Sequence, residues 1–432
     1  MRNILQHRGL KLIFIANVIS MVGSGMNAAG VIWFILQSTH SEMALGTLLM
    51  LQTIPALLML PFTGVVIDRK DRRRLVMVLD AARGLIILAV AVLALNGLAK
   101  LWEIYLMSIL VAAGFWMFWP TINALIQELT PDSQFAHSNS FLLAGFQGGW
   151  LVAGAVVGFV YNHIGLGGVL LIDFSTYVAS FTCYLFVRKG RHVVSPPAGD
   201  RLHQGEVARY LHELREGIAY IRLRPRLILT GTAWALFIGA MFTQGIITAP
   251  FSERILNAGA VGYGWLNAGW AIGACLGCFY VPALLRSTGH RRAIGVAMAL
   301  LGGCLIALPF VGAHLRSGLR GTIALALMVS ALIYCVMGSC RALGGVAITS
   351  SIMEMVPRHF MGRVQNTFYF AATCLQLVFS FLVGAVAHKR SLAEGFSIVG
   401  ALYLLACLAG TWPVAKPHQA VKGTHGAVTV ES

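Results

Sequence analysis

The feature that most constrains the fold is a succession of long apolar runs joined by short polar links. A helix that spans a bilayer needs about 20 mainly apolar residues, so this chain of 432 residues accommodates about twelve such helices. Only 11% of the residues are charged, whereas soluble domains carry about a quarter. The sequence therefore predicts an all-α membrane protein with twelve transmembrane helices.

A polar, basic segment divides the apolar runs into two sets of six. Apolar side chains recur at helical spacing within it, from Val207 to Ile221, and indicate an amphipathic helix on the membrane surface. We therefore predict a six-helix bundle over 1–188, a linker over 189–226, a second six-helix bundle over 227–414 and a tail over 415–432. Among the predicted spans, the fifth covers 135–161, the sixth 168–187 and the seventh 227–251. The fifth contains Gly154-x-x-x-Gly158, a pattern that favours close helix packing.

Positive charge lies mainly in the links on one side of these predicted helices. The chain has 32 Lys and Arg against 16 Asp and Glu, a formal net charge of +16. We assign about 24 of the 32 cations to one set of links, which the positive-inside rule makes cytoplasmic. Both termini and the linker are then cytoplasmic, and the asymmetry indicates topology rather than a nucleic-acid partner.

The link between the second and third runs carries a recognisable motif. Residues 64–74 read GVVIDRKDRRR, a short hydrophilic stretch with five cations. The pattern resembles the signature between the second and third helices of the major facilitator superfamily. It places the motif on Gly64, Asp68, Arg69, Arg72 and Arg73.

An internal repeat supports two equivalent halves. The fourth run leaves the membrane through Glu128-x-x-Pro131, and the tenth leaves it through Glu354-x-x-Pro357. Each turn is followed by an Asn-[Ser/Thr]-Phe sequence at the start of the next run. The same turn at the same place in both halves indicates duplication of a six-helix unit.

The whole chain resembles a major facilitator transporter, and in detail the bacterial branch that contains enterobactin exporters and macrolide efflux pumps. The matching pieces lie in the first, second and eleventh predicted helices and in the links before the third, seventh and eleventh. They are residues 21–26, Pro55, Asp68 with Arg69, residues 214–220, Val356 with Pro357, and Gly362-Arg363-Val364.

The resemblance implies two pseudo-symmetric bundles around a central cavity that opens alternately to each side. The first, fourth, seventh and tenth helices would line this cavity. Asp68 would cap the start of the eleventh helix, and Arg72 would pair with Glu128 at the inner end of the fourth. A monomer in a bacterial inner membrane, without a cofactor, is expected.

Ionisable residues inside predicted spans mark further candidates, because such groups are costly in lipid. Asp80 and Arg83 share a helix face three residues apart and are expected to pair. Asp173 is the deepest carboxylate, so Asp80 and Asp173 are the candidate proton carriers. Arg341, on the tenth run, is expected either to bind an anionic substrate or to serve as a structural cation.

The predicted substrate cavity combines aromatic and amide side chains on helices that should line it. Such surfaces suit a bulky amphiphilic ligand. The candidate cavity residues are Asn27, Trp116, Trp119, Asn123, Gln244 and Arg341.

Four functions remain open at this point. A proton-driven exporter of a drug, macrolide or siderophore is preferred over an inward carrier of a lipid or nutrient. A membrane-embedded transferase is disfavoured, because Asp68-x-x-Asp71 is surrounded by cations and no second acidic cluster follows. A non-transporting sensor is the fourth. We find no metal-ligand set or nucleophile–base set, and read Cys275-x-x-Cys278 as packing residues.

Overall fold

The computed structural model describes residues 8–129, 135–187, 206–318 and 323–413. Within these ranges the chain is helical and contains no strand. Some side chains in the helices also fall outside the description, including those of Asp68, Arg69 and Glu128.

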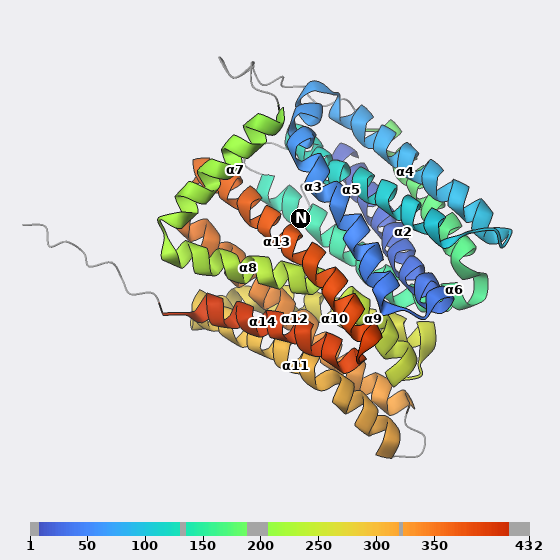
Figure 1. Cartoon of the computed structure of the whole chain (residues 1–432). Coiled ribbons are helices and arrows are strands. Elements are labelled where there is room, and N and C mark those ends of the chain that lie inside the picture. The colour runs from blue at the N-terminus through green and yellow to red at the C-terminus, as the bar shows by residue number, and fades with distance from the viewer. Residues whose placement is uncertain (1–7, 130–134, 188–205, 319–322, 414–432) are drawn as a thin grey trace, which may run out of the picture.

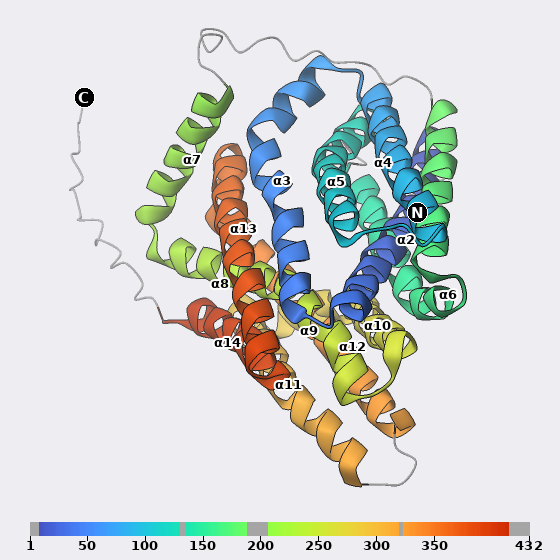
Figure 2. The same ribbon diagram turned by 45° about the vertical axis from the view of Figure 1, so that its right-hand side comes forward.

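In chain order, a single linker helix, α7 (Glu206–Arg222), separates two groups of helices. The first half runs from blue to green and the second from yellow-green to red (Figures 1 and 2). The first half comprises α2 (Arg8–Thr39), α3 (Glu42–Arg69), α4 (Arg72–Leu95), α5 (Leu101–Leu129) and α6 (Phe135–Leu185). The second comprises α8 (Pro225–Thr243), α9 (Gly245–Pro250), η2 (Phe251–Ile255), α10 (Gly259–Thr288), α11 (His290–Gly318), α12 (Ile323–Met355), α13 (Arg358–Lys389) and α14 (Leu392–Thr411).

The long helical segments match the predicted architecture. The described residues contain twelve of them when the two arms of α6 are counted separately and α8–η2 as one. Ten helices among the described residues are long and apolar enough to cross a membrane, judged by length and composition. The predicted amphipathic helix is present as α7.

Two predicted links are shorter than expected. The fifth and sixth spans form one element, α6, interrupted only at Gly165, whose φ of 64° favours glycine. The basic motif lies largely within α3, because that helix continues to Arg69 and only Lys70 and Asp71 separate it from α4. The Asp71 carboxylate accepts a hydrogen bond from the Arg74 amide and so caps α4.

The seventh span continues beyond its predicted end at residue 251. The helix passes through Pro250 and finishes in a π-helical turn, η2, at Ile255. Proline lacks an N–H and disrupts regular α-helical bonding, so a local change of helix type at this point is expected.

Close packing between the two halves uses small residues. The predicted pair Gly154 and Gly158 on α6 lies against α10: a Cβ on Gly154 would lie 3.0 Å from the Asn267 Cβ. A Cβ on Gly158 would collide with the Ala260 carbonyl oxygen. These glycines therefore allow the helices to approach closely, as the sequence pattern predicted.

Candidate functional site

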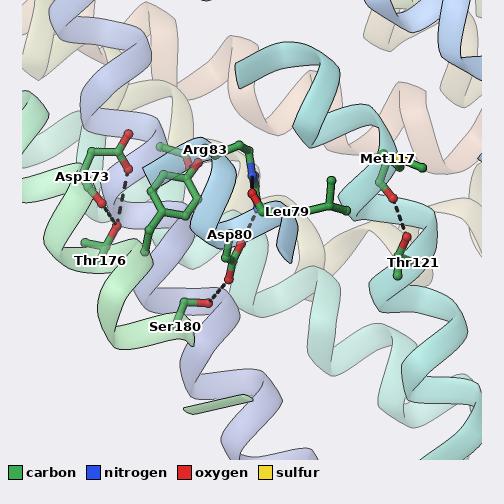
Figure 3. A network of polar contacts seen from close by, with 10 residues as sticks. Leu79, Asp80, Arg83, Met117, Thr121, Asp173, Thr176 and Ser180 are labelled. Atoms are coloured by element: carbon green, nitrogen blue, oxygen red, sulfur yellow. Dashed lines mark hydrogen bonds and ion pairs between the residues drawn. The ribbon is translucent and has the colours of Figure 1, made fainter. Parts of the chain in front are cut away.

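A buried charged cluster occupies the core of the first half. Its charged members are Asp80 and Arg83 on α4 and Asp173 on the second arm of α6, with side chains no more than 1% exposed. Figure 3 shows these three residues together with Thr176 and Ser180. Ionisable groups removed from water are costly unless paired, so their contacts decide what the cluster can do.

Asp80 and Arg83 form the predicted pair. Arg83 Nη2 lies 2.5 Å from Asp80 Oδ1, and the Ser180 hydroxyl donates to Asp80 Oδ2 at 2.7 Å. Arg83 Nε also donates to the Leu79 carbonyl at 3.3 Å. Asp80 is therefore held by one cationic and one neutral donor.

The Arg83 guanidinium lies between aromatic rings. Its central carbon is 4.4 Å from the centre of the Phe118 ring and 4.8 Å from that of Tyr177. These distances allow cation–π attraction. Gly114 on α5 makes room for the side chain, because a Cβ there would lie 2.7 Å from Arg83 Cγ. Nη1 of Arg83 is buried and has no hydrogen-bond partner among the described residues.

Among the described residues, the hydrogen-bonding neighbours of the Asp173 carboxyl are neutral. Asn27 Nδ2 on α2 donates to Asp173 Oδ2 at 2.7 Å, and Thr176 Oγ1 lies 3.4 Å from Oδ1. Arg83 and Asp80 are close enough to interact with it electrostatically. Gly23 on α2 allows this approach, since a Cβ there would lie 2.5 Å from Asp173 Oδ1.

The structure thus places Asn27, a predicted cavity residue, in the buried cluster, where only 6% of it is exposed. Sequence reasoning also missed Thr176, Tyr177 and Ser180. Their positions, three, four and seven residues after Asp173, lie on one helix face and could have indicated a polar stripe. The Tyr177 hydroxyl lies 3.1 Å from the Ser24 hydroxyl on α2.

A neutral polar cluster occupies the core of the second half. The Tyr334 hydroxyl on α12 donates to Thr248 Oγ1 at 3.1 Å, and the Tyr403 hydroxyl on α14 donates to Gln244 Oε1 at 3.4 Å. Gln244, a predicted cavity residue, is therefore buried in this neutral cluster.

The other predicted cavity residues lie on α5 and α12. Trp116, Trp119 and Asn123 are half-buried, and Asn123 Nδ2 donates to the Trp119 carbonyl at 2.9 Å. Arg341 is also half-buried, with Nε 3.1 Å from the Met241 sulfur on α8. This places Arg341 beside the neutral cluster.

The basic motif binds helix ends. Arg72 Nη1 donates to the Ala124 carbonyl at 3.1 Å, one turn before Glu128 on α5. Arg73 donates to the carbonyls of Tyr184 and Leu185 at the end of α6, at 2.8 and 2.6 Å. Cations are favourable at such C-terminal carbonyls.

The expected Asp68 cap and the Arg72–Glu128 pair stay predictions, because the side chains of Asp68 and Glu128 lie outside the description, as does that of Arg69. Gly64 lies in α3 and Gly362 in the first turns of α13. Arg363, the neighbour of Gly362, lies 3.0 Å from Glu216 of α7, so the linker helix is attached to α13 by an ion pair.

At the far end of the bundle, where α3 begins, a contact that the sequence did not suggest joins the halves. Glu42 is fully buried, with Oε1 2.5 Å from Arg254 Nη1 of η2 and Oε2 3.4 Å from His388 Nδ1 of α13. Arg254 Nη2 also donates to the His40 carbonyl at 2.7 Å. We call this the Glu42 contact.

Glycines bring α3 and α13 together beside the Glu42 contact. A Cβ on Gly46 would lie 2.5 Å from the Ser380 carbonyl, and one on Gly384 would lie 2.8 Å from the Glu42 carbonyl. Figure 2 shows the ribbons of α3 and α13 side by side.

Among the described residues, no group of three or more His, Cys, Asp or Glu side chains could hold a metal ion. The seven described cysteines are free thiols.

Comparison with known proteins identifies the architecture. A family model described as "Major Facilitator Superfamily" matches residues 13–372. The chain is 24% identical over 268 residues to the uncharacterized MFS-type transporter YkuC of Bacillus subtilis, covering 61% of this chain and 60% of that protein. It is 24% identical over 229 residues to macrolide efflux protein A of Streptococcus pyogenes, covering 51% and 54%.

A longer match is with the multidrug efflux pump Tap of Mycolicibacterium fortuitum, 23% identical over 398 residues and covering 90% of this chain and 91% of that protein. The aligned parts thus span less than two thirds of YkuC and of macrolide efflux protein A. Among solved structures, the nucleoside transporter NupG superposes with a TM-score of 0.68 at 12% identity, covering 93% of this chain and 98% of that one. A bacterial homologue of ferroportin in an inward-facing state gives 0.69 at 15%, with the same coverage. These structural likenesses show the fold.

Proposed function

Because the chain belongs to the Major Facilitator Superfamily, we propose that this multi-pass membrane transporter exports a bulky amphiphilic small molecule, such as a drug, macrolide or siderophore, in exchange for protons. The efflux names of macrolide efflux protein A and of Tap support the choice of export. We place it in a bacterial inner membrane, as a monomer, with both termini and the linker in the cytoplasm.

The observation that carries the mechanism is the Glu42 contact. It joins the first half to two helices of the second half at one end of the bundle. Arg254 and His388 are each more than 40% exposed there, so water can replace their bonds when the halves separate. This contact would close one side of the carrier and break when that side opens, as alternating access requires.

Substrate recognition would fall to the half-buried residues on α5 and α12. Trp116 and Trp119 would offer aromatic surface to a bulky ligand, Asn123 a hydrogen-bonding group, and Arg341 a positive charge. Gln244 would support this region from within the neutral cluster.

The transferase alternative would need Asp71 to help bind a metal–diphosphate, and the contacts of this residue disfavour that role. Its carboxylate caps α4, accepting from the Arg74 amide at 3.0 Å, and lies 4.0 Å from Arg74 Nε. A carboxylate used in this way is poorly placed to hold a metal–diphosphate. We therefore propose a carrier without enzymatic activity.

Transport in inverted membrane vesicles tests the proposal. A macrolide and the cationic dye ethidium serve as probes, with an imposed proton gradient, without one, and in vesicles that lack the protein. We expect gradient-dependent accumulation only where the protein is present. Equal accumulation with and without the gradient would contradict proton exchange, and no accumulation of either probe would contradict this substrate class.

A further inference from the structure

We propose that the charged cluster is the proton-binding site of the transport cycle, with the proton carried by Asp173 and its presence sensed by Arg83. The inference rests on the proposed exchange of substrate for protons and assigns that exchange to particular atoms.

Binding of one proton would neutralise the net charge of the cluster. Asp80, Arg83 and Asp173 are together shielded from solvent, and with both carboxyls ionised they carry a net charge of −1. An uncompensated charge in a dry interior costs several kcal/mol. One bound proton makes the cluster neutral, whereas its loss leaves a charge that the surroundings must stabilise.

The contacts of the two carboxyls assign the proton to Asp173. Asp80 already holds the Arg83 guanidinium at 2.5 Å and the Ser180 hydroxyl at 2.7 Å. A carboxyl that accepts from a cation favours its ionised form. Asp173 accepts from the neutral amide of Asn27 at 2.7 Å.

Thr176 provides an acceptor for this proton. Its hydroxyl lies 2.7 Å from the Asp173 backbone carbonyl, which takes its single hydrogen. The same oxygen lies 3.4 Å from Asp173 Oδ1 and, with its hydrogen taken, has a lone pair to offer that carboxyl. A protonated Asp173 can donate to that lone pair.

Arg83 is placed to respond when the proton leaves. Its Nη2 binds Asp80, while the buried Nη1 has no hydrogen-bond partner among the described residues. Arg83 also interacts electrostatically with Asp173. An ionised Asp173 would attract the guanidinium, and the flat faces of Phe118 and Tyr177 would let it shift.

The groups around Asp173 connect this response to α2. The titratable neighbours are Asp80 and Arg83 on α4 and Tyr177 on the same helix as Asp173. α2 contributes Asn27 and Ser24, which bond to Asp173 and Tyr177. A shift of Arg83 therefore changes the bonds that hold α2, an expected cavity-lining helix. In each cycle Asp173 takes a proton from water on one side and returns it to water on the other.

Infrared difference spectroscopy of the purified full-length protein tests the site without a substrate. The carbonyl stretch of a protonated, buried carboxyl should disappear as the pH is raised. We expect this signal in the wild type and in Glu394→Gln, a carboxyl variant outside the cluster, and its loss in Asp173→Asn. Persistence of the signal in Asp173→Asn would overturn the assignment.

Two further variants keep the test decisive. Asp173→Glu should retain the signal at a shifted position, so a folding failure of one variant does not end the test. Asp80→Asn should weaken the infrared signal of protonated Asp173, because an Arg83 released from Asp80 would stabilise the ionised form of Asp173. An unchanged signal in Asp80→Asn would overturn the role of Arg83. A wild-type signal without gradient-driven transport in vesicles would refute the proposed exchange but not the proton site.

Discussion

The polar cores of the two halves use equivalent helices with different chemistry. In the first half an amide on the first helix, Asn27, meets the carboxyl of Asp173 on the sixth. In the second half an amide on the seventh helix, Gln244, meets the phenol of Tyr403 on the twelfth. One core is titratable and the other is held by neutral hydrogen bonds.

This difference suggests a division of work. A neutral cluster is satisfied by its own donors and acceptors, so it can support a binding surface at any pH. The net charge of the charged cluster changes when a proton binds or leaves, so its contacts can respond to a proton gradient. We therefore assign proton coupling to the first half and much of substrate discrimination, through Arg341, to the second.

The largest expected loss of stability comes from removing the cation of the charged cluster. Arg83→Leu leaves Asp80 buried without its partner, which should cost about 3–5 kcal/mol. At about 2 °C per kcal/mol, the melting temperature should fall by roughly 6 °C or more. Tyr334→Phe, which removes one hydrogen bond of the neutral cluster, should cost only about 1 kcal/mol. If thermal unfolding experiments showed equal losses of melting temperature for Arg83→Leu and Tyr334→Phe, the proposed difference between the two polar cores would be wrong.

A smaller effect is expected from crowding the cluster. Gly23→Ala places a methyl group against Thr176 and 2.5 Å from Asp173 Oδ1, which should cost about 1–3 kcal/mol. Gly148→Ala on α6 is the matched control, since a Cβ there meets nothing within 4 Å. Gly23→Ala should also weaken gradient-driven efflux. Identical melting curves and efflux for the two variants would show that the close approach of α2 is unimportant.

The Glu42 contact provides the next comparison, between the two ends of the bundle. Glu42→Gln replaces the ion pair with Arg254 by a weaker bond, at a cost of about 1 kcal/mol because Arg254 is half-exposed. Separation of the halves at this end should become more frequent. Cysteines at Thr53 and Gln376, whose side chains are 2.8 Å apart across the halves, should then cross-link less efficiently. His388→Gln should have a smaller effect, since its contact is longer.

The smallest overall effect, but a selective one, is expected at Arg341. Arg341→Ala should lower transport of acidic or catechol-type compounds more than that of cationic dyes, because only the former gain from the charge. Arg341→Lys should restore part of the loss, since an ammonium keeps the charge but lacks the planar fork. Uptake of both classes should be measured in vesicles with equal amounts of folded carrier. Equal losses for both classes would make Arg341 structural.

The sequence predicted the features that depend on the spacing of residues within one helix. Apolar runs defined the helices, and the three-residue spacing of Asp80 and Arg83 predicted their pair because both partners lie on one helix. Gly154 and Gly158 predicted a close helix contact for the same reason, although not which helix they meet.

Contacts between distant segments could not be predicted in this way. Asn27 and Asp173 are 146 residues apart, and a helix pattern alone does not say which neighbour a polar side chain faces. The Glu42 contact joins three helix ends, and single charged residues near span ends usually indicate only topology. Both sites required the packing of the helices.

The most direct test of the account is a count of protons moved with substrate by the reconstituted carrier. Purified protein in sealed liposomes would receive a macrolide as probe, with an entrapped pH-sensitive dye reporting proton movement. The account predicts that the wild type moves protons against the macrolide, whereas Asp173→Asn exchanges the macrolide across the membrane without moving protons. Proton movement in Asp173→Asn equal to that of the wild type would contradict the assignment of the proton to the charged cluster.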